Sequence, residues 1–220
     1  MHCDICTIPV AEMFEPRDGC PICRMRQMLD DRMTEYITGA AMMEPDVRKS
    51  TNEKGFCNRH YQMMLARRNR LSVALMLESH LAELQKKVSS VLSRGNKTGA
   101  CFVCEQVDAN MAALIGNTLK LYEDDRDFRQ LFSEQPAICL PHFTMLTEAA
   151  DKRMGRRFRG ELKKAAEKIV LQNLEELKSD VKHFCDMFDY RNNTEEADWG
   201  NSRDAIERAV EFLTSFPAGK

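Results

Sequence analysis

Eight cysteine and histidine residues recur at regular spacings and could bind metal ions. A CxxC sequence is followed by a CxxH sequence, and the same order appears again later in the chain. The eight residues are Cys20, Cys23, Cys57, His60, Cys101, Cys104, Cys139 and His142. Thiolates and imidazoles are preferred zinc ligands, and four of them complete a tetrahedral shell. The sequence therefore predicts two Cys3His sites for two zinc ions, both structural because no coordination position is left for a substrate.

The spacing of these motifs indicates a tandem duplication. The cysteine of CxxH follows the second cysteine of CxxC by 34 positions in the first copy and by 35 in the second. An Asp-x-Arg sequence lies between the motifs in both copies and begins at Asp46 and Asp127. Copies of one repeat share one structural plan. We expect an N-terminal segment over 1–19, related units over 20–97 and 98–190, and a loop with a C-terminal helix over 191–220.

Composition and periodicity predict an all-α fold, a helical bundle built from the two units. Glycine and proline are scarce, with 10 and 7 residues among 220. Each unit should contain a first helix after CxxC, near 24–40 and 105–122, a loop with Asp-x-Arg, and a longer helix beginning at CxxH. Apolar stripes on the longer helices predict the core. They comprise Leu77, Leu81, Leu84, Val88 and Val91, and then Val170, Leu174, Leu177, Val181, Phe184 and Phe188.

A final short helix is predicted near the end of the chain. Asp204 is suited to cap its N-terminus, and the helix should end at about Thr214. Its apolar positions recur at helical spacing and should pack against the bundle. They are Ile206, Ala209, Val210 and Leu213.

Several interpretations of the cysteines remain open at this stage. The first CxxC could pair with the CxxH of its own unit or with Cys139 and His142. The same ligands could hold an iron–sulfur cluster, and CxxC before a helix is also typical of thiol redox proteins. Asp46 and Asp127 could accept the second ring N–H of the histidines, or form ion pairs with the neighbouring arginines. Cys3 and Cys6 form a third CxxC without a matching CxxH, and we interpret them as a reduced pair.

The composition favours a cytoplasmic protein. Apolar residues make up 43% of the chain and the net charge is −2, which is typical of a folded globular protein. No apolar run has the length of about 18 to 20 residues that a membrane span needs, and the N-terminus lacks a secretory signal. Nine cysteines, an odd number in a long chain, suit metal binding in a reducing compartment better than a disulfide framework.

A basic stretch is the main feature that points to a partner. Eight lysines and arginines lie between Lys152 and Lys168, so nucleic acid is one candidate ligand. The chain has no glycine-rich phosphate loop, nucleophile elbow or HExxH sequence. The sequence therefore favours an interaction or regulatory module with an unknown protein partner over an enzyme.

Several of these segments resemble an uncharacterised bacterial family of helical proteins with a domain of unknown function. The similar segments include the CPIC sequence at 20–23, MMEPDVR at 42–48, GFCNRH at 55–60 and FDYRN at 188–192. The resemblance extends over nearly the whole chain. It implies a cytoplasmic protein but no known activity, and Cys3 and Cys6 depart from the family pattern.

Overall fold

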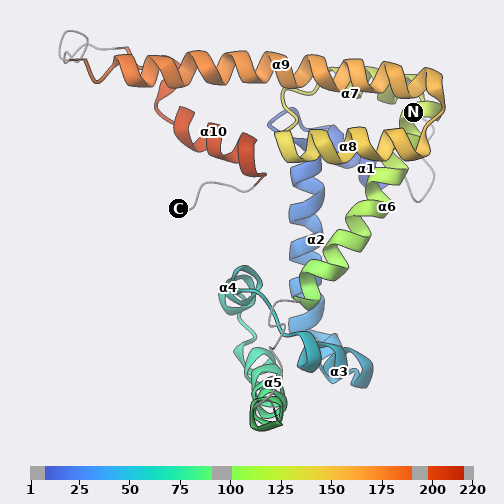
Figure 1. Cartoon of the computed structure of the whole chain (residues 1–220), viewed down its shortest axis with the longest axis vertical. Coiled ribbons are helices and arrows are strands. Elements are labelled where there is room, and N and C mark those ends of the chain that lie inside the picture. Colours follow the sequence, from blue (N-terminus) through green and yellow to red (C-terminus); the bar gives the residue numbers. More distant parts are fainter. Residues whose placement is uncertain (1–7, 91–100, 190–197, 216–220) are drawn as a thin grey trace. The chain divides into compact units, whose positions relative to one another are not determined.

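The structure is a computed structural model that describes residues 8–90, 101–189 and 198–215. Within these ranges the chain forms ten α-helices and two short 3₁₀ helices, η1 (Ala40–Met43) and η2 (Gly200–Ser202), and no strand (Figure 1). The predicted all-α fold with two related units is therefore confirmed. None of the helices in these ranges combines the length and hydrophobicity that a membrane span requires.

The described residues form two compact units, and each contains parts of both sequence repeats. One unit combines the residues up to Met25 with those from Leu114 onward, and the other extends from Arg26 to Ala113. Helices α2 (Pro21–Thr38) and α6 (Phe102–Asp124) each continue from one unit into the other. The compact units thus differ from the sequence repeats, whose boundaries remain a prediction about the duplication.

The first unit is organised around its longest helix. This helix, α9 (Arg156–Asp186), packs against α7 (Arg126–Ser133), α8 (Leu140–Arg153) and α10 (Ala205–Thr214). Figure 1 shows α8 and α9 side by side. The short helix α1 (Ile8–Phe14) contacts α7 through Phe14. The centroid of its ring lies 4.9 Å from that of Phe128 and 5.7 Å from that of Phe132. Aromatic packing therefore forms one part of this core.

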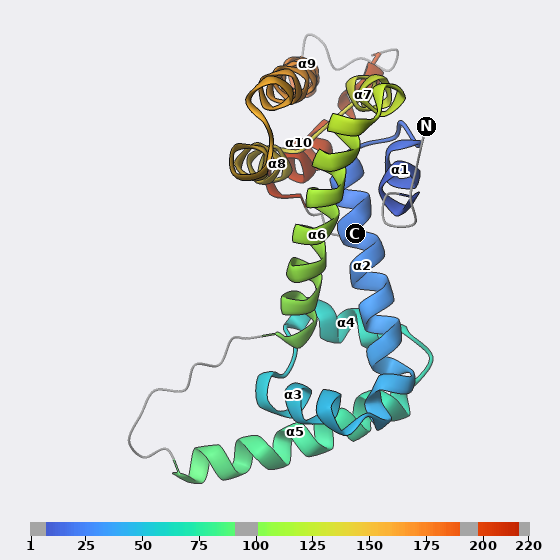
Figure 2. The same cartoon turned by 90° about the vertical axis from the view of Figure 1, so that its right-hand side faces the viewer.

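The second unit contains α3 (Pro45–Lys54), α4 (Asn58–Ala66) and α5 (Arg70–Ser90). Helix α5 packs against both α3 and α4, and Figure 2 shows α3 beside α5. Arg48 on α3 donates hydrogen bonds to Leu75 O at 3.0 Å and to Ser79 Oγ at 2.7 Å on α5. These bonds fix α3 against the N-terminal half of α5.

The two Asp-x-Arg segments are short helices, so the prediction of loops was wrong. Pro45 occupies the first turn of α3, where its missing N–H costs no hydrogen bond. Asp125 caps α7 by accepting the N–H of Phe128 at 2.9 Å. The longer helices predicted after CxxH are also each divided in two, because Arg67 and Met154 have extended backbone conformations.

The apolar stripes predict the buried faces only in part. Leu81 and Val88 on α5 are 59% and 67% exposed, whereas Val73 and Met76 near its start are buried. Helix α3 makes hydrogen bonds along the first half of α5, where these buried side chains lie.

The stripe on α9 is divided in the same way. Val170 and Leu177 are buried as predicted, but Leu174 is exposed, as is Phe188 just after the helix. The packing face predicted for α10 was wrong, since Ala205 and Phe212 are buried there and the large apolar positions are exposed. These exposed positions are Ile206, Val210 and Leu213. Val91 lies outside the described residues.

The burial pattern on α5 predicts a contrast between two substitutions on the same helix. Met76→Ala should lower the free energy of unfolding by about 2–5 kcal/mol, because it leaves a cavity beside α3. Leu81→Ala should change it by less than about 0.5 kcal/mol, because that side chain is exposed. Urea unfolding followed by circular dichroism measures both. Equal losses would mean that the exposed half of α5 is covered in solution.

Candidate metal centres

The eight predicted ligands come together in two groups of four, and each group contains ligands from both sequence repeats. The first cluster contains Cys20, Cys23, Cys139 and His142. The second cluster contains Cys57, His60, Cys101 and Cys104. Each cluster thus joins the CxxC of one repeat to the CxxH of the other, which decides the pairing that the sequence left open. In each cluster the four donor atoms lie within 4.8 Å of one another, so both are positioned to bind a metal ion.

Each cluster is built from the N-termini of two helices. Cys139 is the N-cap of α8, and His142 follows in its first turn. Cys20 immediately precedes α2, and the N–H of Arg24 donates to its carbonyl oxygen at 3.3 Å. In the second cluster, α4 and α6 begin in the same way at Cys57 and Cys101. A helix N-terminus carries partial positive charge and free N–H groups, which favour thiolate over thiol.

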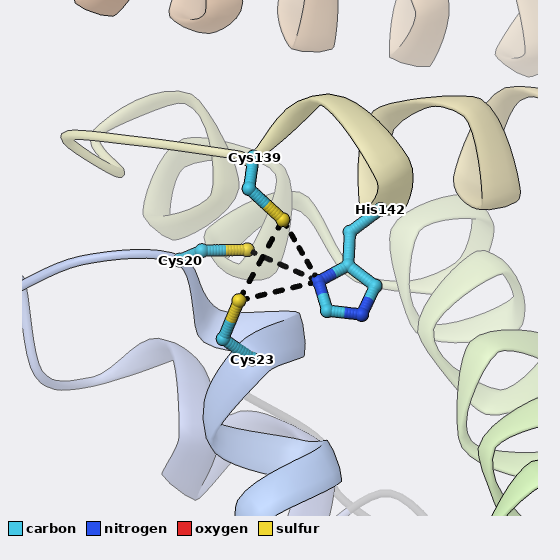
Figure 3. A group of neighbouring side chains, drawn as sticks. All are labelled: Cys20, Cys23, Cys139 and His142. Atoms are coloured by element: carbon cyan, nitrogen blue, oxygen red, sulfur yellow. Dashed lines mark hydrogen bonds between the residues drawn. The ribbon is translucent and has the colours of Figure 1, made fainter. Parts of the chain in front are cut away.

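In the first cluster, the histidine ring nitrogen Nδ1 faces the three sulfurs (Figure 3). His142 Nδ1 lies 3.0 Å from Cys139 Sγ, 3.3 Å from Cys23 Sγ and 3.8 Å from Cys20 Sγ. Cys23 Sγ and Cys139 Sγ are 3.6 Å apart. Ser215 Oγ, just after α10, lies 3.4 Å from Cys139 Sγ. The C-terminal helix therefore ends against this cluster.

The second cluster repeats this arrangement. His60 Nδ1 lies 3.2 Å from Cys57 Sγ, 3.3 Å from Cys101 Sγ and 3.4 Å from Cys104 Sγ. Cys57 Sγ and Cys104 Sγ are 3.8 Å apart. Both imidazoles are buried, at 1% exposure for His60 and 2% for His142. The duplicated sequence thus produces two centres of the same ligand set and similar geometry.

These separations fit a single tetrahedral ion. Zinc bonds of about 2.3 Å to sulfur and about 2.0–2.1 Å to nitrogen imply tetrahedral edges of roughly 3.8 Å between sulfurs and roughly 3.6 Å between sulfur and nitrogen. The S···S distances of 3.6 and 3.8 Å agree with the first value. The S···N distances extend from 3.0 to 3.8 Å and require adjustments of up to roughly 0.6 Å. The donor set is therefore compatible with one ion in each cluster.

A glycine turn places Cys57 beside the second CxxC. Gly55 ends α3 with a φ of 68°, a conformation that other residues rarely adopt. Its carbonyl oxygen accepts the N–H of Phe102 at 3.0 Å, one residue after Cys101. A Cβ at this position would lie 2.7 Å from His80 Nε2. Glycine thus allows both the turn and the close approach that bring the half-sites together.

Asp30 is a residue of the second cluster's surroundings that the sequence did not reveal. Its carboxylate is fully buried on α2 and accepts a hydrogen bond from His60 Nε2 at 3.0 Å. Arg59 forms an ion pair with the same carboxylate. Asp46 and Asp127, for which the sequence left open this role or an ion pair with the neighbouring arginine, are both exposed. A carboxylate on Nε2 fixes the ring so that Nδ1 presents its lone pair to a metal ion.

The electrostatics of the second cluster favour one imidazolium facing one thiolate, whereas burial and the neighbouring Cys101 and Cys57 raise the pKa of Cys104 to about 12. Burial opposes the charged form of His60, but hydrogen bonds to Asp30 and Cys101 outweigh burial and raise the pKa of His60 to about 10. Burial also opposes the Cys101 thiolate, yet hydrogen bonds from His60 and from backbone N–H groups lower its pKa to about 6. Metal ligands must be deprotonated, so binding of an ion here releases the Nδ1 proton of His60 and the thiol proton of Cys104.

In the first cluster, too, burial and hydrogen bonding shift the pKa values of the ligands in opposite directions. Hydrogen bonds with Cys20, Cys23 and His142 lower the pKa of Cys139 far below its usual value. Burial opposes the charged form of His142, but contacts with Cys139 and Cys20 raise its pKa to about 9. One thiolate thus faces one imidazolium, and a metal ion would replace that proton as the positive partner.

Comparison with known proteins places the chain in a family. The family DUF6062, described as a family of unknown function, matches residues 1–100 and again residues 91–218. The chain belongs to this family. The two matches agree with the two related units seen in the ligand spacing. No curated protein and no solved structure matches the chain. The third CxxC, Cys3 and Cys6, lies outside the described residues.

The hydrogen bond from Asp30 predicts a selective effect on the second cluster. Asp30→Asn should weaken metal binding there by about 10- to 100-fold, because His60 loses the carboxylate that orients it. Competition with a chelator of known affinity measures the change. Asp46→Asn is the matched control, since Asp46 is exposed on α3, and it should leave both affinities unchanged. Equal affinities for Asp30→Asn and the parent protein would remove Asp30 from this role.

Proposed function

We propose that both clusters bind zinc and act as closed structural centres that connect the two sequence repeats. The observation that carries the proposal is the convergence of two complete Cys3His sets from segments far apart in the sequence. Four protein ligands leave no coordination position for a substrate. The ions then hold the scaffold together, and the metal itself takes no part in a reaction.

The distances support a single ion over an iron–sulfur cluster. In a multi-iron cluster the protein ligands bind to separate iron atoms and surround a core that also contains sulfide. In both groups here, all four donor atoms lie within 4.8 Å of one another. Cys3His is a common ligand set of structural zinc. Thiol redox chemistry without a metal needs no histidine, yet both buried imidazoles point Nδ1 at three sulfurs.

Such centres are strong enough to control folding. A structural zinc site contributes about 10–16 kcal/mol of apparent binding free energy at pH 7, against a typical net domain stability of about 5–15 kcal/mol. We propose that the resulting scaffold is a cytoplasmic interaction or regulatory module with a protein partner. Exposed apolar side chains along one face of α10 support this role. They are Ile206, Val210 and Leu213.

Elemental analysis of the purified chain tests the metal proposal. We expect about two zinc per chain, about one for Cys57→Ser and about one for Cys139→Ser, because each variant removes a thiolate from a different cluster. Cys185→Ser is the matched control, since Cys185 is exposed on α9 and belongs to neither cluster, and it should keep two. Iron with stoichiometric sulfide, or unchanged zinc in the two cluster variants, would contradict the proposal.

Nucleic-acid binding is a second candidate function, favoured by the surface of α9. Several cations of the basic stretch are paired, as Lys163 is with Asp151 and Arg157 is with Glu161. Four others are exposed and have no ion-pair partner among the described residues. They are Lys152 near the end of α8 and, on α9, Arg156, Lys164 and Lys168. Exposed cations along a helix could contact successive phosphates of a nucleic-acid strand.

Substitution of three of these cations tests the second candidate. If α9 contacts phosphates, the combined change of Arg156, Lys164 and Lys168 to Ala should weaken retention on nucleic acid. The slope of the logarithm of the binding constant against the logarithm of the salt concentration should become shallower by about 2 to 3, because three phosphate contacts are lost. The combined change of Lys178 and Lys182 to Ala is the control, because these lysines on the same helix pair with Glu175 and Asp186. Retention that does not differ between the two variants removes this candidate.

A further inference from the structure

A cavity of about 270 Å³ lies against the first cluster. Three of its lining residues are the cluster cysteines Cys20, Cys23 and Cys139, and the lining also includes Asn173 on α9 and Phe212 on α10. The volume is below that of pockets for drug-sized ligands but ample for molecules little larger than water. A small solute can therefore approach the sulfurs of this cluster from the cavity.

The histidines of the two clusters are held differently. His60 donates from Nε2 to the buried carboxylate of Asp30, but no described residue hydrogen-bonds to Nε2 of His142. The sequence gives the reason, since Asp30 lies seven residues after Cys23 and the equivalent position after Cys104 is Met111. A thioether is at most a weak acceptor. Loss of such a carboxylate typically weakens metal binding by about 10- to 100-fold.

We propose that the first cluster is a reactive centre for small oxidants of the peroxide class, which release its metal ion while the second cluster keeps its own. This inference rests on the proposed function, because it requires zinc in both clusters. The oxidation joins Cys23 to one of the two other cavity cysteines. Cys23 shares a turn with Cys20, and its Sγ lies 3.6 Å from Cys139 Sγ.

The reaction balances with hydrogen peroxide alone. One thiolate attacks a peroxide oxygen, so an S–O bond forms, the O–O bond breaks, and the leaving hydroxide takes a proton to become water. The neighbouring thiolate attacks the sulfenic sulfur, so an S–S bond forms, the S–O bond breaks, and a second hydroxide becomes water. Two electrons pass from sulfur to peroxide. Zinc stays divalent and leaves, because one thiolate and one imidazole remain to hold it.

Zinc release under peroxide tests the proposal on the full chain. With excess hydrogen peroxide and a chromogenic zinc chelator, we expect one of the two equivalents to leave at least about tenfold faster than the other. Mass spectrometry after digestion without reductant should find the disulfide at Cys23, and a thiol reductant with added zinc should restore both equivalents. Variants with one intact cluster assign the fast and slow phases of zinc release. Cys57→Ser keeps only the first cluster and should release its ion quickly, whereas Cys139→Ser keeps only the second and should release its ion slowly.

A variant that fills the cavity tests the route of entry. Asn173→Trp should slow the fast phase while the protein still holds two zinc, because the indole occupies space next to the sulfurs. Gln172→Trp is the matched control, since Gln172 is exposed, is not among the cavity residues, and should leave both phases unchanged. Two zinc released at equal rates, or a disulfide in the second cluster, would overturn this inference alone. A chain without zinc would overturn the proposed function together with it.

Discussion

Two helix N-termini meet at each ligand cluster, and the rest of the structure depends on how their charge is balanced. Helices α2 and α8 point their positive ends at the first cluster, and α4 and α6 point theirs at the second. Thiolates neutralise those ends but repel one another. A divalent ion inside the cluster removes that repulsion, while the helix ends still stabilise the remaining negative charge. Helix direction and metal binding are therefore two parts of one electrostatic balance.

The crosswise pairing turns two local motifs into links between distant parts of the chain. Helix α2 carries ligands of the first cluster at its start and Asp30, the hydrogen-bond partner of His60, two turns later. A disturbance of α2 therefore reaches both clusters. Helix α6 carries the ligands of the second cluster at its start and continues into the unit that holds the first. Neither repeat contains a complete ligand set in this arrangement.

The sequence was sufficient to identify all eight clustered residues and the all-α fold, because duplicated spacing marks the ligands and composition favours helix. It could not give the pairing, since the two CxxC motifs are chemically equivalent. Asp30 was missed because Met111 takes its place in the second repeat, so the duplication that revealed the ligands concealed this residue. Apolar residues at intervals of three and four identified a stripe on α5, but they could not show which part of the stripe another helix covers. Leu81 and Val88 belong to this stripe and are exposed.

The order in which the ligands appear along the chain has a consequence for biosynthesis. A protein chain is made from its N-terminus, so the last ligand to leave the ribosome decides when each centre can close. The second cluster is complete once Cys104 has emerged, whereas Cys20 and Cys23 must wait for His142. For that interval of about 120 residues, at roughly 5 to 20 residues per second, the first CxxC of the nascent chain is without its partners. A metal ion that it binds during synthesis must complete its coordination with ligands other than Cys139 and His142, such as solvent or Cys57 and His60 of the same repeat.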